Sequence, residues 1–339
     1  MATEQESQGA IRDSSRSGPY VSAVRWMENL SETAFAYFLL TPALLLLLLI
    51  AIYPLVSTFG MSLFADAISG SASLGEFVGI QNYVELLTNQ KSYALPAPFM
   101  PTSLSVGGIV SSALGVTLIF TVASVFFETI IGFAQALVLD QEFRGRRWIR
   151  VAIIIPWAVP IVIQGMIFFL LFQPGIGFLV GTTQNPSFLN QLGIIGTTPL
   201  VNTIDSLIII TVADVWKTTA FMALLILAGM QSIDRSLYDV ARVSGASPWQ
   251  QFKMITFPLI LPTILVAMLF RTIAAMRVYG IIETTTGCQT VPSLSCLVVS
   301  SFSSRAYGTA ATVAFVTAAI IGIVVSVYIV KFADAEGGF

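Results

Sequence analysis

Long apolar runs alternate with shorter polar segments along most of the chain. A membrane-spanning helix needs about 20 mostly apolar residues, and six runs of the sequence reach that length. The pattern therefore predicts an all-α, polytopic membrane protein with six transmembrane helices. The expected spans are approximately Ala34–Phe64, Ala113–Leu139, Val151–Phe172, Ser206–Met230, Leu259–Ile282 and Ala310–Phe332.

Composition agrees with a membrane protein and excludes several other classes. Of the 339 residues, 55% are hydrophobic and 10% are charged, whereas a soluble domain carries roughly 25% charged residues. The net charge of −2 offers no basic field for nucleic acid. The sequence has no histidine, which removes the usual general base and a common metal ligand and disfavours a membrane enzyme. We expect no metal or cofactor on this chain.

The positive charges predict the orientation of the spans. Lys and Arg collect on the cytoplasmic side of membrane proteins. With the N-terminus inside, eleven of the 16 Lys and Arg residues fall in cytoplasmic segments, and Lys91 and Arg305 fall outside. Both termini are therefore predicted to be cytoplasmic. This divides the chain into a cytoplasmic N-terminal tail at 1–33, partly disordered and then amphipathic, a transmembrane domain at 34–332 and a cytoplasmic C-terminal tail at 333–339.

The two cysteines, Cys288 and Cys296, fall together in the third external segment. The outside is the oxidising side of a membrane, so we expect a local disulfide there. Two free thiols in a packed loop are the alternative.

A polar stretch interrupts the apolar pattern in the cytoplasmic segment 231–258. Apolar positions at helical spacing between Ser232 and Ser244 predict a short amphipathic helix. Gly245 permits a sharp turn, and Ser247-Pro248 suits the start of a second helix that leads into the fifth span. Such a helix-turn-helix on the cytoplasmic surface of the membrane is suited to binding by a partner protein. An interfacial helix without a partner is the alternative.

The same segment resembles the EAA loop of ABC importer permeases. That loop reads Glu-Ala-Ala, three residues, Gly, nine residues, then Ile-x-Leu-Pro. Here the corresponding residues are Asp239-Val240-Ala241, Gly245 and Ile255-Thr256-Phe257-Pro258. Three further runs, FVGIQNYVELL, DVWKTTAFMALLILAGMQSI and LFRTIAAMRVYGIIETTTG, are similar to the maltose-type carbohydrate permeases. Where those permeases continue with Gly-Gly-Pro, this chain has Gly287-Cys288-Gln289.

The resemblance implies the type I ABC importer permease fold in the cytoplasmic membrane of a prokaryote. It implies four partners: a second homologous permease, two ATPase subunits that bind ATP and Mg, and an extracytoplasmic sugar-binding protein. The sequence itself contains no G-x-x-x-x-G-K-[S/T] phosphate loop, so this chain is not expected to be the ATPase. The residues expected to couple to the ATPase are Asp239, Val240, Ala241, Val243, Gly245, Ala246, Ile255 and Pro258.

The resemblance also implies which residues line the substrate path. An aromatic ring with a few hydrogen-bonding groups suits a sugar, although Phe221 and Phe270 are equally explained by helix packing. Ile273 and Ala274 offer no hydrogen bond, so the partner permease is expected to supply more polar contacts. The residues carried over are Thr218, Phe221, Phe270, Ile273, Ala274 and Arg277.

Five charged residues fall within the expected spans: Glu128, Asp214, Lys217, Arg271 and Arg277. Such residues usually face a protein interior or a cavity. Asp214 and Lys217 are three apart on one helix and are expected to neutralise each other. Arg271 and Arg277 are six residues apart and point in different directions around the helix, so one is expected to line the path and the other to face a neighbouring helix.

Other transporters remain as alternatives at this stage. Arg277 would also suit an anionic or phosphorylated solute such as a glycerol phosphate, and ABC permeases for polyamines or oligopeptides share the general architecture. A secondary transporter driven by protons could use Glu128 and Asp214 as relay groups.

Overall fold

The structure, a computed structural model, describes residues 26–27, 29–67 and 74–336. Within these residues the chain forms helices joined by turns and loops, and its only β pairing is an isolated antiparallel bridge between Phe64 and Phe77. The all-α prediction is confirmed for this part of the chain. The start of the polar N-terminal tail lies outside the described residues. Two compact units, residues 1–58 and 59–339, divide the chain, and each is described by itself.

The described part of the first unit is one apolar helical segment. It comprises α3 (Glu32–Leu47), the π-helical turn η1 (Leu48–Ile52) and the start of α4 (Tyr53–Ser62). Ser31 caps its N-terminus by accepting a hydrogen bond from the Ala34 N–H at 3.3 Å. No side chain of α3 or η1 is buried. A helix that is apolar on every side is typical of a membrane span.

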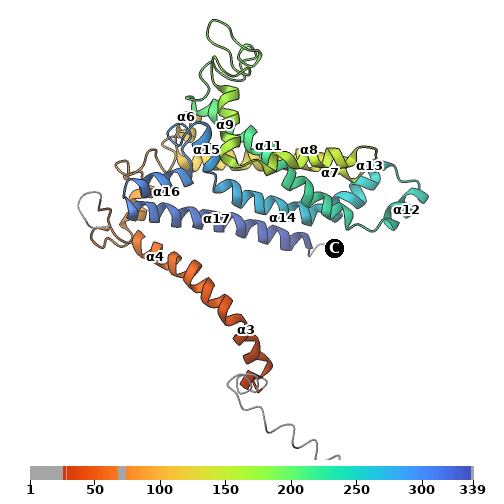
Figure 1. Cartoon of the computed structure of the whole chain (residues 1–339), viewed down its shortest axis with the longest axis horizontal. Coiled ribbons are helices and arrows are strands. Elements are labelled where there is room, and N and C mark those ends of the chain that lie inside the picture. Colours follow the sequence, from red (N-terminus) through yellow and green to blue (C-terminus); the bar gives the residue numbers. More distant parts are fainter. Residues whose placement is uncertain (1–25, 28, 68–73, 337–339) are drawn as a thin grey trace, which may run out of the picture. The chain divides into compact units, whose positions relative to one another are not determined.

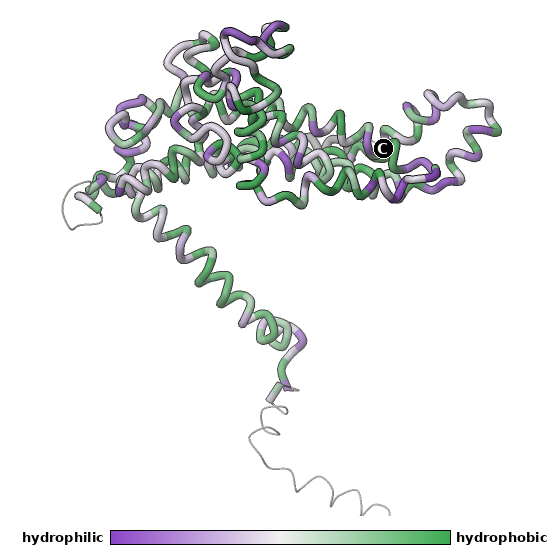
Figure 2. The backbone as a smooth tube through the Cα atoms, turned by 45° about the horizontal axis from the view of Figure 1, so that its top comes forward, coloured by the Kyte–Doolittle hydropathy of each residue, from purple (hydrophilic) through white to green (hydrophobic). Residues whose placement is uncertain are grey.

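Long helices form the body of the second unit (Figure 1). They are α7 (Ala113–Asp140), α11 (Thr203–Gln231), α14 (Phe257–Met276) and α17 (Tyr307–Glu336). Between them lie the shorter elements α5 (Gln81–Leu87), α6 (Val106–Val110), α8 (Arg146–Ala158), α9 (Ile161–Phe172), α10 (Phe188–Gln191), α12 (Ser236–Val243), α13 (Pro248–Gln251), η2 (Phe252–Thr256), α15 (Gly280–Thr285) and α16 (Leu294–Ser303). Figure 2 shows that hydrophobic residues follow the long helices, while hydrophilic residues gather mainly in the connecting segments.

Five helical segments of the described residues are long and apolar enough to cross a membrane. They overlap five of the six predicted spans. Their bounds are Glu32–Ser62, Ala113–Asp140, Thr203–Gln231, Pro248–Met276 and Tyr307–Val330. These five spans were predicted from the length of their apolar runs alone, and the structure contains a long apolar helix at each place.

The third predicted span, Val151–Phe172, is wrong as a single straight helix. The chain there forms α8 and α9, which meet at 93°. Pro160 explains the break because it has no N–H to donate and disfavours helical backbone in the preceding residue. Val159 is indeed extended, with ψ of 127°. Counted as one span, the bent pair brings the total for the described residues to six.

Two predicted helix ends differ from the structure. The fifth span was expected to reach Ile282, but α14 ends at Met276 with Arg277 as its C-cap. The N–H groups of Arg277 and Val278 bond to the carbonyls three residues earlier, which tightens and closes the last turn. At the other end of the chain, α17 continues to Glu336, beyond the expected boundary at residue 332.

Two π-helical turns precede prolines in the same way. η1 ends directly before Tyr53-Pro54, and η2 ends directly before Phe257-Pro258. In both, the aromatic N–H bonds to the carbonyl five residues earlier, as in Phe257 to Phe252. Proline cannot donate the next backbone hydrogen bond, so the helix widens locally where that bond is missing.

Helices α7, α11 and α14 pack together as the core of the second unit. Gly132 of α7 lies directly against α11, because a Cβ at this position would lie 2.7 Å from the Cβ of Met222. The glycine therefore allows the two helices to approach closely. Buried side chains from all three helices surround this contact on one side, namely Ala136, Leu139, Ile226, Leu227, Met230, Ile260 and Ile264.

A buried charged cluster organises the segment after α4. Lys91 is 2% exposed and lies 3.7 Å from Asp66 and 3.1 Å from Glu85. Burial acts to lower the pKa of Lys91, but hydrogen bonds with Tyr93 and Glu85 outweigh it, and the pKa is raised. Asp66 also accepts hydrogen bonds from the backbone and hydroxyl of Thr309 in α17. The cluster thus ties this segment to the last helix.

Candidate functional site

Three charged side chains from three helices meet inside the second unit. Arg271 of α14 donates to both carboxylate oxygens of Glu128 in α7, at 2.5 Å from Nε and 2.8 Å from Nη2. The same Nη2 donates to Asp214 of α11 at 2.9 Å. Glu128 is fully buried and the Arg271 side chain is 9% exposed. Because buried charges need partners, this cluster holds the three helices in one register.

The expected pairing of Asp214 with Lys217 is wrong. Asp214 pairs with Arg271, whose guanidinium can donate to two carboxylates at once. Lys217 instead donates to the backbone carbonyl of Val159, at the break between α8 and α9. The break leaves carbonyls without helical partners, and Lys217 supplies one of the missing donors.

The residues of α14 that were predicted to line the path share one face of the helix. Phe270, Ala274 and Arg277 are all exposed and recur at helical spacing, and Ile273 is half-buried beside them. Arg271 points the other way, into the ionic cluster. The two arginines therefore differ in direction, as their spacing indicates. The exposed face is available to a path or to a neighbouring subunit.

The predicted path residues of α11, Thr218 and Phe221, are half-buried. Thr218 lies within hydrogen-bond distance of Glu128 and of the Asp214 carbonyl, both at 2.6 Å. Its hydroxyl can use its proton for only one of these oxygens. A ligand that met Thr218 would therefore have to donate to it.

One buried polar residue of this region was not predicted. Gln164 of α9 is 1% exposed and donates to the Ala213 carbonyl of α11 at 2.5 Å. Its Oε1 has no hydrogen-bond partner among the described residues. The signal in the sequence is a lone amide within the apolar run Ile161–Phe172. Gln164 joins the bent pair to the core helices.

The second candidate region is the helical hairpin at 236–251. Its first helix, α12, ends in a Schellman motif, in which Gly245 adopts φ of 80°. The Gly245 N–H bonds to Arg242 O at 3.0 Å, and the Ala246 N–H bonds to Ala241 O at 2.9 Å. A glycine adopts this left-handed backbone without strain. Gly245 therefore makes the turn that the sequence predicts.

The second half of the hairpin begins with a capping box. Ser247 accepts a hydrogen bond from the Gln250 N–H at 3.3 Å, and Gln250 accepts one from the Ser247 N–H at 2.7 Å. Pro248 occupies the first helical position, as predicted. Tyr238 and Thr256 are joined by a 2.9 Å hydrogen bond between their hydroxyls. This bond anchors the hairpin to the start of the α14 segment.

Most of the apolar side chains on the hairpin point outward. Val243 is 91% exposed and Val240 is 66% exposed. Trp249 and Met254 are also largely exposed, and neither was among the predicted coupling residues. Exposed apolar side chains on both sides of the turn mark a surface suited to a partner. We refer to Val240, Val243 and Trp249 of the hairpin, together with Met254 of the adjoining η2, as the hairpin surface.

The other predicted coupling residues divide between solvent and core. Asp239 is exposed and lies 3.4 Å from Arg242 on the same helix. Ala241 and Ala246 are half-buried. Ile255 faces inward, against the buried cluster of α7, α11 and α14, and Pro258 is half-buried within α14. These inward residues support the hairpin rather than form its surface.

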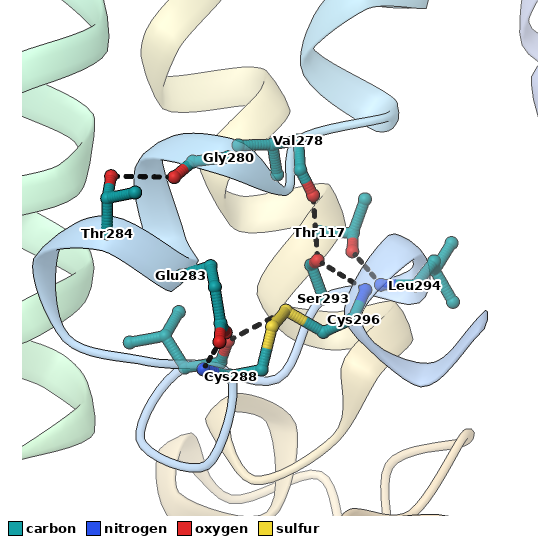
Figure 3. Close-up of a disulfide and its surroundings, with 10 residues drawn as sticks. Thr117, Val278, Gly280, Glu283, Thr284, Cys288, Ser293, Leu294 and Cys296 are labelled. Carbon is teal, nitrogen blue, oxygen red and sulfur yellow. Dashed lines mark hydrogen bonds between the residues drawn. A yellow bond between two sulfur atoms is a disulfide. The ribbon is translucent and has the colours of Figure 1, made fainter. Parts of the chain in front are cut away.

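A disulfide closes the segment between α15 and α16 (Figure 3). Cys288 and Cys296 are bonded, with their Cα atoms 5.6 Å apart, and both are buried. Ser293 accepts a hydrogen bond from the Cys296 N–H at 3.1 Å and donates to Val278 O at 2.8 Å. Glu283 accepts from the Cys288 N–H at 3.1 Å. The loop is therefore fixed at both ends.

Metal binding finds no support in the described part of the chain. No group of three or more His, Cys, Asp or Glu residues able to hold a metal ion occurs there. The carboxylates of Glu128 and Asp214 are engaged by Arg271. The cluster is therefore suited to structural pairing between the three helices.

Together, these features define a multi-pass membrane protein with a buried ionic cluster and a helical hairpin that extends from one end of its long helices (Figure 1). Residues 128–335 match the family described as binding-protein-dependent transport system inner membrane component. The chain belongs to this family. The resemblance noted in the sequence is thereby confirmed.

Curated relatives and solved structures agree with this assignment. The chain is 35% identical to the trehalose/maltose transport system permease protein MalF of Thermococcus litoralis, over 76% of this chain and 78% of the relative. It is 31% identical to the trehalose transport system permease protein SugA of Mycobacterium tuberculosis, over 76% and 75%. It is 33% identical to the sulfoquinovosyl glycerol transport system permease protein SmoG of Agrobacterium fabrum, over 78% and 77%.

The fold is similar to that of a chain in a bacterial ABC transporter involved in the import of the acidic polysaccharide alginate. The TM-score is 0.67 at 19% identity, and the match covers 91% of this chain and 99% of the other. At this identity the match supports the permease fold alone.

Proposed function

We propose that this chain is a permease subunit of an ATP-driven ABC importer for a carbohydrate. Relatives that are 31–35% identical carry names for trehalose or maltose, trehalose, and sulfoquinovosyl glycerol transport. Each of these solutes contains a sugar. The chain would form half of a translocation path with a second, homologous permease, while an extracytoplasmic binding protein delivers the sugar.

The hairpin surface is the observation that carries this proposal. The chain has no G-x-x-x-x-G-K-[S/T] phosphate loop, so an ATP-driven importer needs a separate ATPase subunit. That subunit must bind to a surface of this chain. Val240, Val243, Trp249 and Met254 present apolar side chains on a hairpin whose turn and caps are fully formed. The hairpin runs directly through η2 into α14, which carries predicted path residues. A movement of the ATPase can therefore reach the path through one continuous segment.

The proposed topology has six spans with both termini in the cytoplasm. The bent α8–α9 pair counts as one span. The excess of Lys and Arg in segments expected to be cytoplasmic supports this orientation. The bonded cysteines also support it, because Cys288 and Cys296 then lie on the oxidising side of the membrane.

The ionic cluster favours an ABC importer over a proton-driven transporter. A proton relay would need Glu128 and Asp214 free to gain and release protons. Both accept hydrogen bonds from Arg271, which binds them into a structural contact between three helices.

Uptake by the reconstituted importer tests the proposed function. Proteoliposomes would contain this chain with its partner permease and ATPases, and radiolabelled trehalose or maltose would be supplied with the binding protein. We expect uptake to require ATP in the vesicle lumen, which corresponds to the cytoplasm. Uptake should continue when a proton uncoupler is added. Uptake that stops with the uncoupler and ignores ATP would contradict the proposal.

Arg277→Ala tests the path on α14. Arg277 is exposed at the end of this helix and forms no ion pair within the described residues. A hydrogen bond to a charged group contributes about 1.5–3 kcal/mol, so we expect uptake at low substrate concentration to fall by roughly tenfold or more. Arg277→Lys keeps the charge and should retain part of the activity.

Co-purification with the ATPase distinguishes a path defect from an assembly defect in these variants. Assembly of Arg277→Ala should equal that of the unmodified chain. Normal uptake by Arg277→Ala would remove Arg277 from the path.

A further inference from the structure

The start of α8 forms a basic cavity that the proposed function does not use. Arg146, Arg147 and Arg150 line it, together with Gln231 at the end of α11. Its volume is about 380 Å³. Three guanidinium groups around one cavity create a strongly positive site.

These arginines have no acidic partner among the described residues. No carboxylate there lies within ion-pair distance of them, and the nearby Asp140 is paired with Arg235 at 3.1 Å. The Nε atoms of Arg146 and Arg150 are shielded from solvent and have no hydrogen-bond partner within the same residues. Buried donors normally have partners. Within the described part of the chain, the cavity therefore has positively charged donors but no negatively charged acceptor.

An apolar groove begins on the same helix, directly beside the basic cavity. Ile149, Ala152, Ile153 and Pro156 of α8 line it, opposite residues of α7 and α11. Its volume is about 990 Å³, and almost all its lining side chains are apolar. Arg150 lies between Ile149 and Ala152 in the sequence, so the positive site and the groove adjoin along one helix.

We propose that this composite site binds an anionic phospholipid. The arginines would hold the headgroup phosphate, for which guanidinium groups provide matched pairs of donors. The acyl chains would lie in the groove. Trp148 on the same turn is 76% exposed, and exposed Trp is typical of helices at the membrane–water interface. Basic cavities between helices at this level suit anionic lipid headgroups.

The charge of the cavity and the shape of the groove favour this ligand over others. A zwitterionic lipid brings no net negative charge for three arginines. A soluble phosphate would not use the groove. An apolar helix of another subunit would fill the groove but would leave the arginines without acceptors.

The test is lipid binding by the purified full-length chain, measured by native mass spectrometry. The probes are dioleoyl phosphatidylglycerol, dioleoyl phosphatidylcholine and inorganic phosphate. We expect phosphatidylglycerol to bind at least about tenfold more tightly than phosphatidylcholine, since each Arg near the membrane surface contributes appreciably to the attraction of anionic lipid. Inorganic phosphate at equal concentration should not displace it.

Matched variants locate the site. Arg146→Gln/Arg150→Gln removes two charges from the cavity and should weaken phosphatidylglycerol binding by about tenfold or more. Arg144→Gln/Lys253→Gln removes two exposed charges from the same end of the helices and should leave binding unchanged. Ala152→Phe narrows the groove and should weaken phosphatidylglycerol binding while the arginines remain. Each variant is compared only after its elution as a single folded species.

Three outcomes would overturn the proposal. The first is equal binding of the two lipids. The second is full displacement by inorganic phosphate with no effect of Ala152→Phe, which would indicate a soluble anion. The third is loss of lipid from the assembled importer together with a cross-link from Ala152→Cys to another subunit, which would assign the groove to a protein helix. If the double Gln variant fails to fold, Arg146→Lys/Arg150→Lys replaces it in the test. This variant keeps both charges and should still bind phosphatidylglycerol.

Discussion

Replacing Arg271 with methionine should destabilise the chain more than any other single change considered for its spans. The substitution leaves Glu128 fully buried without its partner and removes the hydrogen bond to Asp214. Removing one member of a buried ion pair costs about 3–5 kcal/mol, because the remaining charge is uncompensated. We expect a clear fall in the temperature at which the purified protein loses its single size-exclusion peak.

Arg277→Met is the matched control for Arg271→Met. It makes the same chemical change on the same helix, at an exposed residue outside the ionic cluster, so its melting temperature should stay near that of the unmodified chain. Neutralising both carboxylates in the Arg271→Met background, with Glu128→Gln and Asp214→Asn, should recover part of the loss. Equal melting of the two single arginine variants would refute a structural role for the cluster.

Gly245→Asp should separate insertion of the chain from its coupling to the ATPase. No atom lies within 4 Å of the position that a Cβ would occupy at Gly245, so the side chain meets nothing within this chain. It would project from the turn of the hairpin, beside Val243, towards any partner there. The left-handed backbone adds about 1 kcal/mol of strain. We expect normal insertion but loss of ATPase co-purification or of substrate-stimulated hydrolysis.

Gly193→Asp controls for backbone strain in that experiment. Gly193 also has a left-handed backbone, with φ of 69°, and also has nothing within 4 Å of its Cβ position. It lies between α10 and α11, far along the chain from the hairpin, and its substitution should leave coupling intact. Asp239→Ala should give only a mild defect, because Asp239 and Arg242 form an exposed pair worth at most about 1 kcal/mol. Coupling by Gly245→Asp at the unmodified level would reduce the hairpin to an interfacial anchor.

The long helices could be predicted from the sequence because their determinant is local. A run of apolar residues without charges defines a span by its length, and α7 and α11 end within a few residues of the expected positions. Hydropathy does not show, however, whether an apolar run forms one straight helix or bends. The apolar pattern continues through Pro160, so the sharp bend between α8 and α9 was missed although the proline that causes it was visible.

The partners of the buried charges were beyond prediction from spacing. Asp214 and Lys217 are close on one helix, which made them the natural pair. Arg271 lies 57 residues after Asp214 and 143 after Glu128, and only the packing of three helices brings the groups together. The hairpin was easier to predict from the sequence, because Gly245, Ser247 and Pro248 determine its turn and cap through their own backbone preferences.

The π-helical turn η2 can act as a pivot between the hairpin and the predicted path residues of α14. A helix is most easily bent where its regular hydrogen bonds are interrupted, and η2 lies between α13 and α14 with Pro258 just beyond it. α14 has 20 residues, which corresponds to an arm of about 30 Å at the helical rise of 1.5 Å per residue. A rotation of about 10° at this pivot would displace the far end, where Arg277 lies, by roughly 5 Å. Small rotations at the hairpin would thus be sufficient to change the width of a passage lined by the C-terminal end of α14.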